Sequence, residues 1–333
     1  MRGLVTVFGG SGFIGSQTVR ALAKQGWRIR VAVRRPWQAY RQRMLGDVGQ
    51  IEIVQANVRV PETVQRALEG AEAVVYAVGA AFESGHQTFA ALNAEGPKTV
   101  AEAAAQLGVG RFVLVSGLGV ETNPSIKAAR AREGEAAVRA AISGATILRP
   151  SVVFGPDDQF FNKLAAMAVM SPVMPVICAA SRVQPVFVAD VARAAAAVLQ
   201  DPATEGQIFE LGGPSIYTLR EIAELTLAQI GRPRTLVDLP DGFAGLIGIG
   251  GDVLGFLRGP LPMLPPPPVT SDQVALMKTD NVVAAGALGL ADLGVTPASL
   301  EPIIPTYLYR YRKGGQFADL SPPELIRGVT LAG

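Results

Sequence analysis

The chain has 333 residues, of which 49% are apolar and 17% are charged, so it is too apolar to be disordered and long enough for one large domain or a large and a smaller one. One histidine (His86) and one cysteine (Cys178) exclude a disulfide framework, a zinc cluster and a histidine-ligated metal centre. A Ser-His-Asp hydrolase would have to use His86, which lies in a polar, loop-like stretch. The net charge of +2 argues against a nucleic-acid binder.

Charge is divided unevenly along the chain. Residues 1–150 contain 18 Lys and Arg against 11 Asp and Glu, and residues 151–333 contain 12 against 17. The first acidic residue is Asp47, although eight Lys and Arg lie between Arg20 and Arg43. The basic half therefore includes a long stretch without any carboxylate.

The start of the chain and its composition bear on location. An apolar strand begins within two residues of Met1, so we expect no signal or transit peptide. Arg outnumbers Lys by 24 to 6, which is typical of a GC-rich bacterial genome.

Strand and helix patterns alternate through the first half. Helices are predicted over 13–24, 61–69, 90–107 and 127–142, and Pro61 suits the first turn of the second of these. Buried strands are predicted over 4–9, 28–33, 50–56, 71–78, 111–117 and 145–150. Because parallel neighbours need crossover helices, the pattern predicts an α/β fold with a Rossmann-type, doubly wound parallel sheet. We assign residues 1–150 to an NADP(H)-binding domain.

The second half is less regular. Residues 151–312 are predicted to form a smaller α/β region that closes over the nucleotide, and residues 313–333 an extended tail. A strand, a turn and a helix are expected over 183–201, a strand over 208–213, and a helix over 218–230 with Thr218 and Glu221 as its capping box. The uncharged stretch Leu164–Ser181 has nearly the length of a membrane span, but its two prolines favour a buried helix followed by a strand.

A glycine-rich loop directly follows the first strand and opens a helix. Small residues let the backbone approach a pyrophosphate, whose charge is stabilised at the helix N-terminus. At this place in a strand–loop–helix unit the motif predicts a dinucleotide site, although a plain glycine turn is the alternative. The expected ligands are Gly9, Gly10, Ser11, Gly12, Phe13, Ile14 and Gly15.

The end of the second strand indicates which dinucleotide binds. An NAD site normally has a carboxylate there to accept from the ribose 2′-hydroxyl. This strand ends instead in Arg34 and Arg35, whose guanidinium groups match a 2′-phosphate. The sequence therefore predicts NADPH, unless the two arginines are ordinary surface charge.

Several motifs resemble the short-chain dehydrogenase/reductase superfamily in its extended, atypical members: GGSGFIG at 9–15, LNAEG at 92–96, LVSGLG at 114–119 and VFVADVA at 186–192. The resemblance covers about residues 3–230. It implies that Asn57 and Val58 lie near the adenine. It adds to the expected cofactor-binding set Asn57, Val58, Val78, Gly79, Ala80, Ser116, Lys127, Pro150 and Val153.

Active members of this superfamily pair a tyrosine with a lysine four residues later. Here the resemblance places Lys127 and Ala131 at these two positions, and no tyrosine occurs between Tyr76 and Tyr217. An ordinary lysine amine is protonated at neutral pH and is a poor base. We therefore expect no catalytic residue.

The stretch TILRPSVVFGPDDQFFN at 146–162 is more specific, and is similar to the family of NADPH-binding accessory subunits of respiratory complex I (NADH:ubiquinone oxidoreductase). That resemblance implies a nucleotide held without turnover, and contacts with other complex I subunits where the peripheral and membrane arms meet. It places the chain peripherally on the cytoplasmic face of the bacterial inner membrane, or on the matrix side if mitochondrial.

Two segments bear on docking. The apolar segment 243–264 is expected to lie on membrane lipid or on another subunit, with a loop covering the cleft as the alternative. The aromatic and basic run 307–313 suggests an interfacial anchor, or the solvated end of a last helix.

Two other functions stay open at this point. One is an active NADP-dependent reductase or epimerase that uses Lys127 with Ser116, and the other is a soluble NADP(H) redox sensor.

Overall fold

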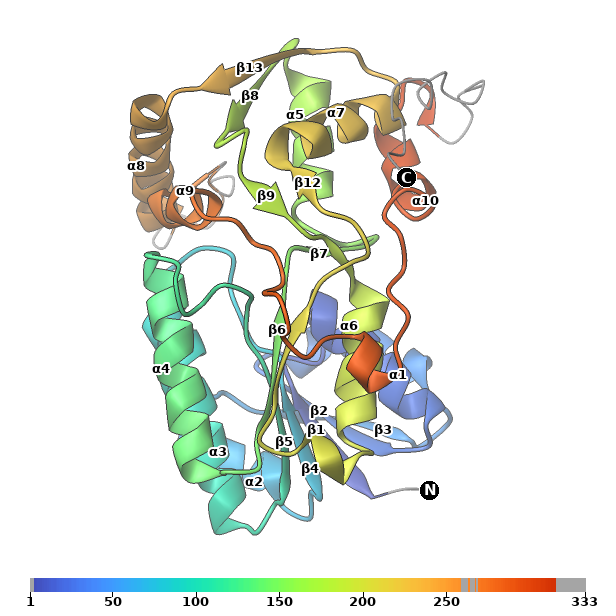
Figure 1. Ribbon diagram of the computed structural model, residues 1–333. Coiled ribbons are helices and arrows are strands. Elements are labelled where there is room, and N and C mark those ends of the chain that lie inside the picture. Colours follow the sequence, from blue (N-terminus) through green and yellow to red (C-terminus); the bar gives the residue numbers. More distant parts are fainter. Residues whose placement is uncertain (1–2, 259–262, 264–266, 268, 316–333) are drawn as a thin grey trace.

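The computed structural model describes residues 3–258, 263, 267 and 269–315, which form two lobes stacked one above the other (Figure 1). The lower lobe is a parallel sheet with helices on both faces, and the upper lobe consists of short strands and helices. The proline-rich stretch 261–270 and the expected tail 313–333 fall largely outside the described residues.

All seven strands of the large sheet are parallel, in the order β11-β6-β5-β4-β1-β2-β3. Val5 of β1 pairs with Ile29 of β2 and with Ala73 of β4, so the strand order reverses beside β1. This is the doubly wound Rossmann arrangement that the alternating pattern predicts. The strands are β1 (Leu4–Phe8), β2 (Arg28–Val33), β3 (Ile51–Gln55), β4 (Ala73–Tyr76), β5 (Arg111–Val115), β6 (Thr146–Pro150) and β11 (Ile208–Leu211).

Helices cover the sheet on both faces, each burying one apolar core. α1 (Phe13–Lys24) packs with α6 (Val188–Val198) on one face. α2 (Pro61–Leu68), α3 (Gly96–Gln106) and α4 (Ile126–Ala141) cover the other, where a π-helical turn η3 (Ala90–Glu95) leads into α3. Ser125 caps α4 by accepting from the Ala128 amide at 3.1 Å.

The sheet takes its last strand and one helix from the second half of the chain. β11 pairs with β6, Leu211 lying opposite Pro150, and α6 packs against α1. The boundary that we placed at residue 150 therefore falls inside the part of the chain that builds the lower lobe. After β6 the chain enters the upper lobe for about forty residues. It then returns through α6 to the large sheet, where β11 adds as a parallel strand.

Paired short strands hold the upper lobe. β7 (Val153–Phe154) pairs with β10 (Val186–Phe187), β8 (Val173–Ile177) with β13 (Thr235–Leu239), and β9 (Arg182–Val183) with β12 (Tyr217–Thr218). α5 (Phe161–Met170) followed by β8 confirms the helix and strand expected over Leu164–Ser181. Among the described residues, no helix is both long and apolar enough to cross a bilayer. α7 (Leu219–Ile230) has the predicted capping box of Thr218 and Glu221.

The segment 307–313 is not an exposed anchor at its start. Tyr307 and Leu308 of α10 (Pro305–Leu308) are buried in the upper core, and the Tyr307 hydroxyl donates to Asp158 Oδ2 at 2.7 Å. Their role in the core overrides the interfacial interpretation of the aromatic run.

The remaining short turns are η1 (Pro36–Gln38), η2 (Tyr40–Leu45), η4 (Pro202–Thr204), η5 (Ala291–Leu293) and η6 (Tyr309–Tyr311).

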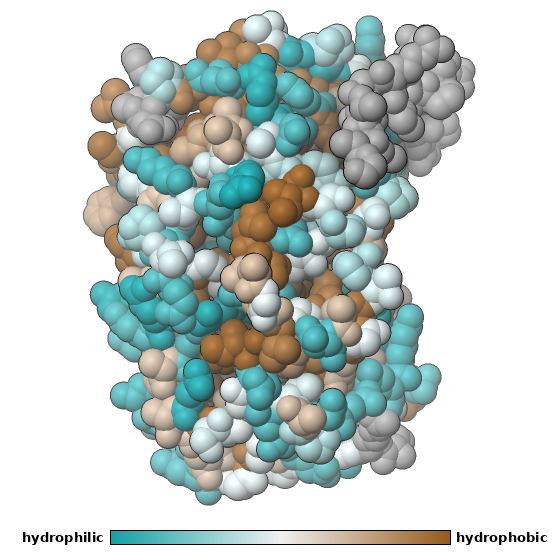
Figure 2. Space-filling view, viewed as in Figure 1, coloured by the Kyte–Doolittle hydropathy of each residue, from teal (hydrophilic) through white to brown (hydrophobic). Residues whose placement is uncertain are grey.

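The glycine-rich segment forms α8 (Asp241–Arg258), which packs against the chain leading into α9 (Ser271–Met277). Its inner face is made of glycines: a Cβ on Gly248 would lie 2.8 Å from the Ser271 Cα, and one on Gly251 would lie 1.7 Å from the Val269 carbonyl oxygen. Among the side chains of α8 that the structure describes, five bulky apolar ones are exposed: Leu246, Ile249, Val253, Phe256 and Leu257. Hydrophobic atoms accordingly appear along the edge of the molecule where α8 lies (Figure 2).

Candidate nucleotide-binding site

A cavity opens at the carboxyl ends of β1, β2, β3 and β4, where the strand order reverses. Ligands of doubly wound folds bind in this crevice, because the strand ends diverge there and leave backbone amides exposed. No carboxylate belongs to the described lining, which consists of Gly9, Ser11, Gly12, Ala32, Val33, Arg34, Ala56, Val58, Ala77, Val78, Gly79, Gln87 and Leu92.

The loop after β1 needs its glycines for close backbone packing. Gly9 has φ +77°, and a Cβ there would lie 2.6 Å from the Ala77 carbonyl oxygen. A Cβ on Gly15 would lie 2.2 Å from the Gly9 carbonyl oxygen, so helix α1 can approach the loop only without a side chain. Gly12 differs, because its Cβ position meets only the Gly9 oxygen, at 3.2 Å.

The N-terminus of α1 is open to an anion. Gly12 is its N-cap residue, and no side chain accepts from the amides of the first turn. Unpaired amides and the positive end of the helix dipole together favour a phosphate. The glycine loop, the uncapped amides and the absence of a carboxylate in the lining therefore fit a dinucleotide pyrophosphate.

Arg34 brings positive charge to the rim of the cavity. Its Nη2 donates to Gln87 Oε1 at 3.0 Å, and the guanidinium remains exposed at the end of β2. Arg35 is also exposed but does not line the cavity. Arg34 is thus the better placed of the two arginines to meet a ribose phosphate.

The structure brings seven of the expected cofactor residues to the cavity and leaves the others outside its described lining. Lining it are Gly9, Ser11, Gly12, Arg34, Val58, Val78 and Gly79. Outside are Gly10, Phe13, Ile14, Gly15, Arg35, Asn57, Ala80, Ser116, Lys127, Pro150 and Val153. Sequence reasoning missed Ala32, Val33, Ala56, Ala77, Gln87 and Leu92, although the ends of the predicted strands pointed to the first four.

Some outer residues support the site from behind. Gly10 lies among the side chains of Val7, Val19 and Val31, where a Cβ would be within 3.0–3.3 Å of each. Asn57 shapes the turn after β3. Its side-chain Oδ1 accepts from the backbone amide of Arg59, and its backbone amide donates to Thr63 Oγ1. These contacts fix the backbone that leads to Val58.

Ser116 and Lys127 lie beyond the β4 side of the cavity, at the end of β5 and the start of α4. The Ser116 hydroxyl is buried and has no hydrogen-bond partner in the described structure. The Lys127 ammonium lies 6.0 Å from the centre of the Phe89 ring. Burial lowers the pKa of Lys127, while the nearby Asp272 carboxylate opposes the change.

Asp272 of α9 connects the upper lobe to the start of helix α4. Its Oδ1 accepts from the amides of Ile126 at 2.6 Å and Lys127 at 3.3 Å, so a carboxylate of α9 caps helix α4. Burial raises the pKa of Asp272, and the hydrogen bonds from Lys127 and Ile126 oppose it. This partly buried carboxylate therefore links α9 to the first turn of α4, where the partly buried Lys127 lies.

Comparison with known proteins identifies the family of the domain that contains the lower lobe. An NAD(P)H-binding family model matches residues 9–202, which confirms the expected nicotinamide dinucleotide cofactor class. The NADPH-dependent quinone oxidoreductase of Escherichia coli, solved with NADPH, superimposes with a TM-score of 0.72 over 92% of this chain and 99% of that one, at 22% identity. At that identity the similarity shows a shared fold and nothing further.

Relatives in sequence cover more of the molecule. The NADH dehydrogenase [ubiquinone] 1 alpha subcomplex subunit 9 of Arabidopsis thaliana is 31% identical over 317 residues, covering 94% of this chain and 79% of the relative. A ceramide reductase of Caulobacter vibrioides is 36% identical over 244 residues, covering 72% and 74%. The chain therefore belongs to the NAD(P)H-binding family and, within it, to the family of the alpha subcomplex subunit 9 of NADH:ubiquinone oxidoreductase.

Proposed function

We propose that this protein is an NADPH-binding accessory subunit of respiratory complex I that holds its nucleotide without turnover. The observation that carries the proposal is the extent of the similarity. It runs over 94% of the chain to a complex I subunit and thus continues past residue 202, where the NAD(P)H-binding model ends. The upper lobe is included, and a shared binding domain alone would not require that.

NADPH is the form of the cofactor that the site favours. Arg34 lines the cavity, and no described lining residue carries a carboxylate that would repel a 2′-phosphate. The first turn of α1, with Gly12 at its cap, would hold the pyrophosphate. Bound NADPH supplies a hydride in reductases; here its binding energy would stabilise the lower lobe.

Lack of turnover is inferred from the residues beside the cavity. Lys127 and Ala131 occupy the positions that the resemblance gives to the tyrosine and lysine, and Ala131 is buried without any group that can move a proton. Burial lowers the pKa of Lys127 and outweighs the opposing Asp272 carboxylate, so we infer the lack of turnover from the missing tyrosine and not from the charge of this amine.

Helix α8 is the surface that we propose for docking to other complex I subunits. Gly248 and Gly251 face inward, and five of its described apolar side chains are exposed, Phe256 to 80%. An exposed apolar stripe of this kind marks an interaction surface. We place the protein peripherally where the two arms of the complex meet, on the cytoplasmic side of a bacterial membrane, with α8 also close enough to contact lipid.

A second candidate is a reductase of lipid carbonyls. The ceramide reductase relative covers 72% of this chain, and burial lowers the pKa of Lys127, which makes its ammonium a stronger acid than an exposed one. Lys127 with the Ser116 hydroxyl would then donate the proton to a carbonyl oxygen.

One experiment separates the two candidates. Native membranes are extracted with mild detergent and the protein is traced by native electrophoresis. Co-migration with NADH dehydrogenase activity and bound NADPH is expected. Migration of the protein alone, together with NADPH oxidation on adding a ceramide-type ketone at rates abolished by Lys127→Met, would instead establish the reductase.

A further inference from the structure

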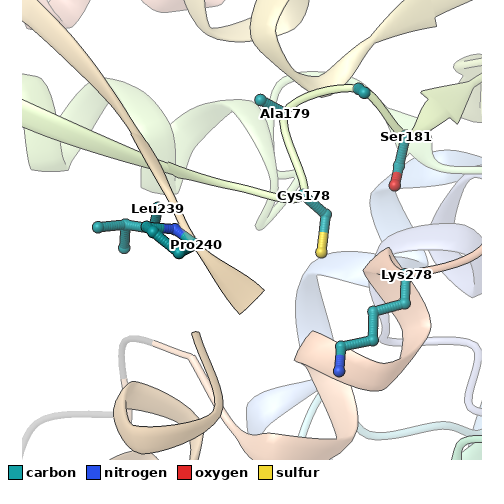
Figure 3. A pocket seen from close by; sticks show the side chains of 7 residues that line it. Cys178, Ala179, Ser181, Leu239, Pro240 and Lys278 are labelled. Carbon is teal, nitrogen blue, oxygen red and sulfur yellow. The ribbon is translucent and has the colours of Figure 1, made fainter. Parts of the chain in front are cut away.

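A second cavity lies in the upper lobe, apart from the nucleotide site. It measures about 690 Å³ and is lined by Cys178, Ala179, Ala180, Ser181, Leu239, Pro240 and Lys278 (Figure 3). That volume is in the range of roughly 300–1,000 Å³ that small-molecule sites occupy. It opens where two paired parallel strands end, because Ile177 of β8 lies opposite Leu239 of β13.

The turn that forms one wall is fixed in an unusual conformation. Cys178 has φ +50°, in the left-handed region that residues other than glycine rarely adopt. The Ser181 amide donates to the Cys178 carbonyl oxygen at 2.9 Å, and the amides of Leu219 and Arg220 donate to the carbonyls of Ser181 and Ala179. Strained backbone held rigidly by its surroundings occurs at ligand sites.

The lining divides into a polar and an apolar side. In Figure 3 the Ser181 hydroxyl and the Lys278 side chain lie on one side, with Leu239 and Pro240 across the cavity. The neighbouring Arg182 is paired with Asp280 at 2.7 Å, but Lys278 has no ion pair with any carboxylate in the described part of the chain. The cavity thus offers one unneutralised cation at the edge of an apolar wall.

We infer that this cavity binds a single-chain amphiphile with an anionic head group. The head lies on the Lys278 ammonium within reach of the Ser181 hydroxyl, and the alkyl chain covers Leu239, Pro240 and the alanines of the turn. A cationic or uncharged head would leave Lys278 unpaired, so the charge of the head sets the selectivity. This site is separate from the nucleotide cavity and does not depend on the function proposed above.

Calorimetric titration of the full chain with decanoate, below its micelle concentration and without nucleotide, tests the inference. Saturable binding is expected, weakened at least tenfold by Lys278→Gln and abolished by Ala180→Trp, which fills the cavity from its exposed wall. Lys24→Gln, an exposed lysine of α1, is the matched control and should bind like the parent. Decyl phosphate should bind as decanoate does if the anion alone matters, and decyltrimethylammonium should not bind.

Cys178 gives a local readout because it is the one cysteine of the sequence. Decanoate should slow its alkylation by iodoacetamide in the parent and in Lys24→Gln, and at the same concentration much less in Lys278→Gln. Decanoate binding that is unchanged in both Lys278→Gln and Ala180→Trp would overturn the inference, as would equal binding of the cationic amphiphile or no saturable binding of either anion. Each result is independent of NADPH binding and of assembly.

Discussion

At the end of β2, we expect a single side chain to set which dinucleotide the cavity favours. Arg34 lines the cavity, and Arg41 of η2 is an exposed arginine that does not. We expect Arg34→Gln to weaken NADPH about tenfold, or about 1.4 kcal/mol, and to leave NADH almost unchanged, because a charge-assisted contact to the 2′-phosphate is lost. Fluorescence titration of both nucleotides checks this. Equal loss of NADPH affinity in Arg41→Gln would show that the effect is a general one of net charge.

The glycine loop allows binding and folding to be tested separately. At Gly12 a Cβ would meet only the Gly9 carbonyl oxygen, at 3.2 Å, and aspartate is a good N-cap residue, so Gly12→Asp should change the unfolding temperature of the nucleotide-free protein much less than Gly15→Ala does. Its carboxylate would repel the pyrophosphate, and the stabilisation of about 2.7 kcal/mol expected at an NADPH concentration of a hundred times Kd would vanish.

Gly15 is the structural counterpart of Gly12. Gly15→Ala would bring a Cβ against the Gly9 oxygen and should lower the unfolding temperature even without nucleotide. Thermal unfolding of both variants with and without NADPH makes the comparison. An NADPH-induced rise that survives in Gly12→Asp would contradict the assignment of the loop.

Local signals account for the part of the site that was predictable. The glycine loop and the arginine after β2 are short-range motifs, and the structure places Gly9, Gly12 and Arg34 together. Gln87 belongs to no motif, and Leu92 opens the LNAEG motif without having been expected in the lining. Their place in the lining depends on how the segment after β4 folds back over the sheet. Ser116 and Lys127 were expected to bind the nucleotide, and whether they do stays a prediction.

Between elements, the carboxylate of Asp272 on α9 couples the lobes through the first turn of α4. Burial raises its pKa, so the folded state holds the proton more tightly than the unfolded state. Its contribution to stability must then fall as pH rises from the ordinary carboxyl pKa through the raised folded value. Asp272→Asn removes this titration and keeps an acceptor, so its unfolding temperature relative to the parent should rise through that interval.

Asp272→Ala is the matched variant without an acceptor. It should be less stable than Asp272→Asn by about 1 kcal/mol, because the amides of Ile126 and Lys127 lose their cap. Thermal unfolding from about pH 4 to 8 measures both variants. Parallel pH profiles for the parent and Asp272→Asn would show that the carboxyl does not titrate in this range.

The elements themselves were predictable where their causes are local. The capping box of Thr218 and the proline that opens α2 lie where the sequence indicates them. Helix α8 was harder to predict, since glycine disfavours a helix by about 1 kcal/mol per residue. Its glycines are required by close packing on Val269 and Ser271, a tertiary contact that no local pattern reveals. The parallel strand β11 was expected as a strand, but its return to the first sheet follows from the crossover.

On the scale of the whole molecule, the outward face of α8 exposes apolar side chains to water, which is unfavourable for a monomer. Replacing Ile249 and Phe256 by serine should abolish co-migration with complex I and leave NADPH affinity unchanged, because both side chains are exposed and neither lines the nucleotide cavity. Unfolding temperature should change little, since exposed substitutions usually cost within about 0.5 kcal/mol.

The control for the α8 variant is the double substitution Met44→Ser and Val48→Ser, which replaces two exposed apolar side chains of the lower lobe. The controls remove a similar amount of apolar surface from the lower lobe, so a general loss of hydrophobic adhesion would affect both pairs alike. Native electrophoresis of detergent extracts distinguishes the cases. Assembly that fails for the α8 pair alone would assign docking to α8. Assembly of the α8 pair at the parental level would show that the partner contacts another surface, and would leave the helix as a cover for the upper lobe.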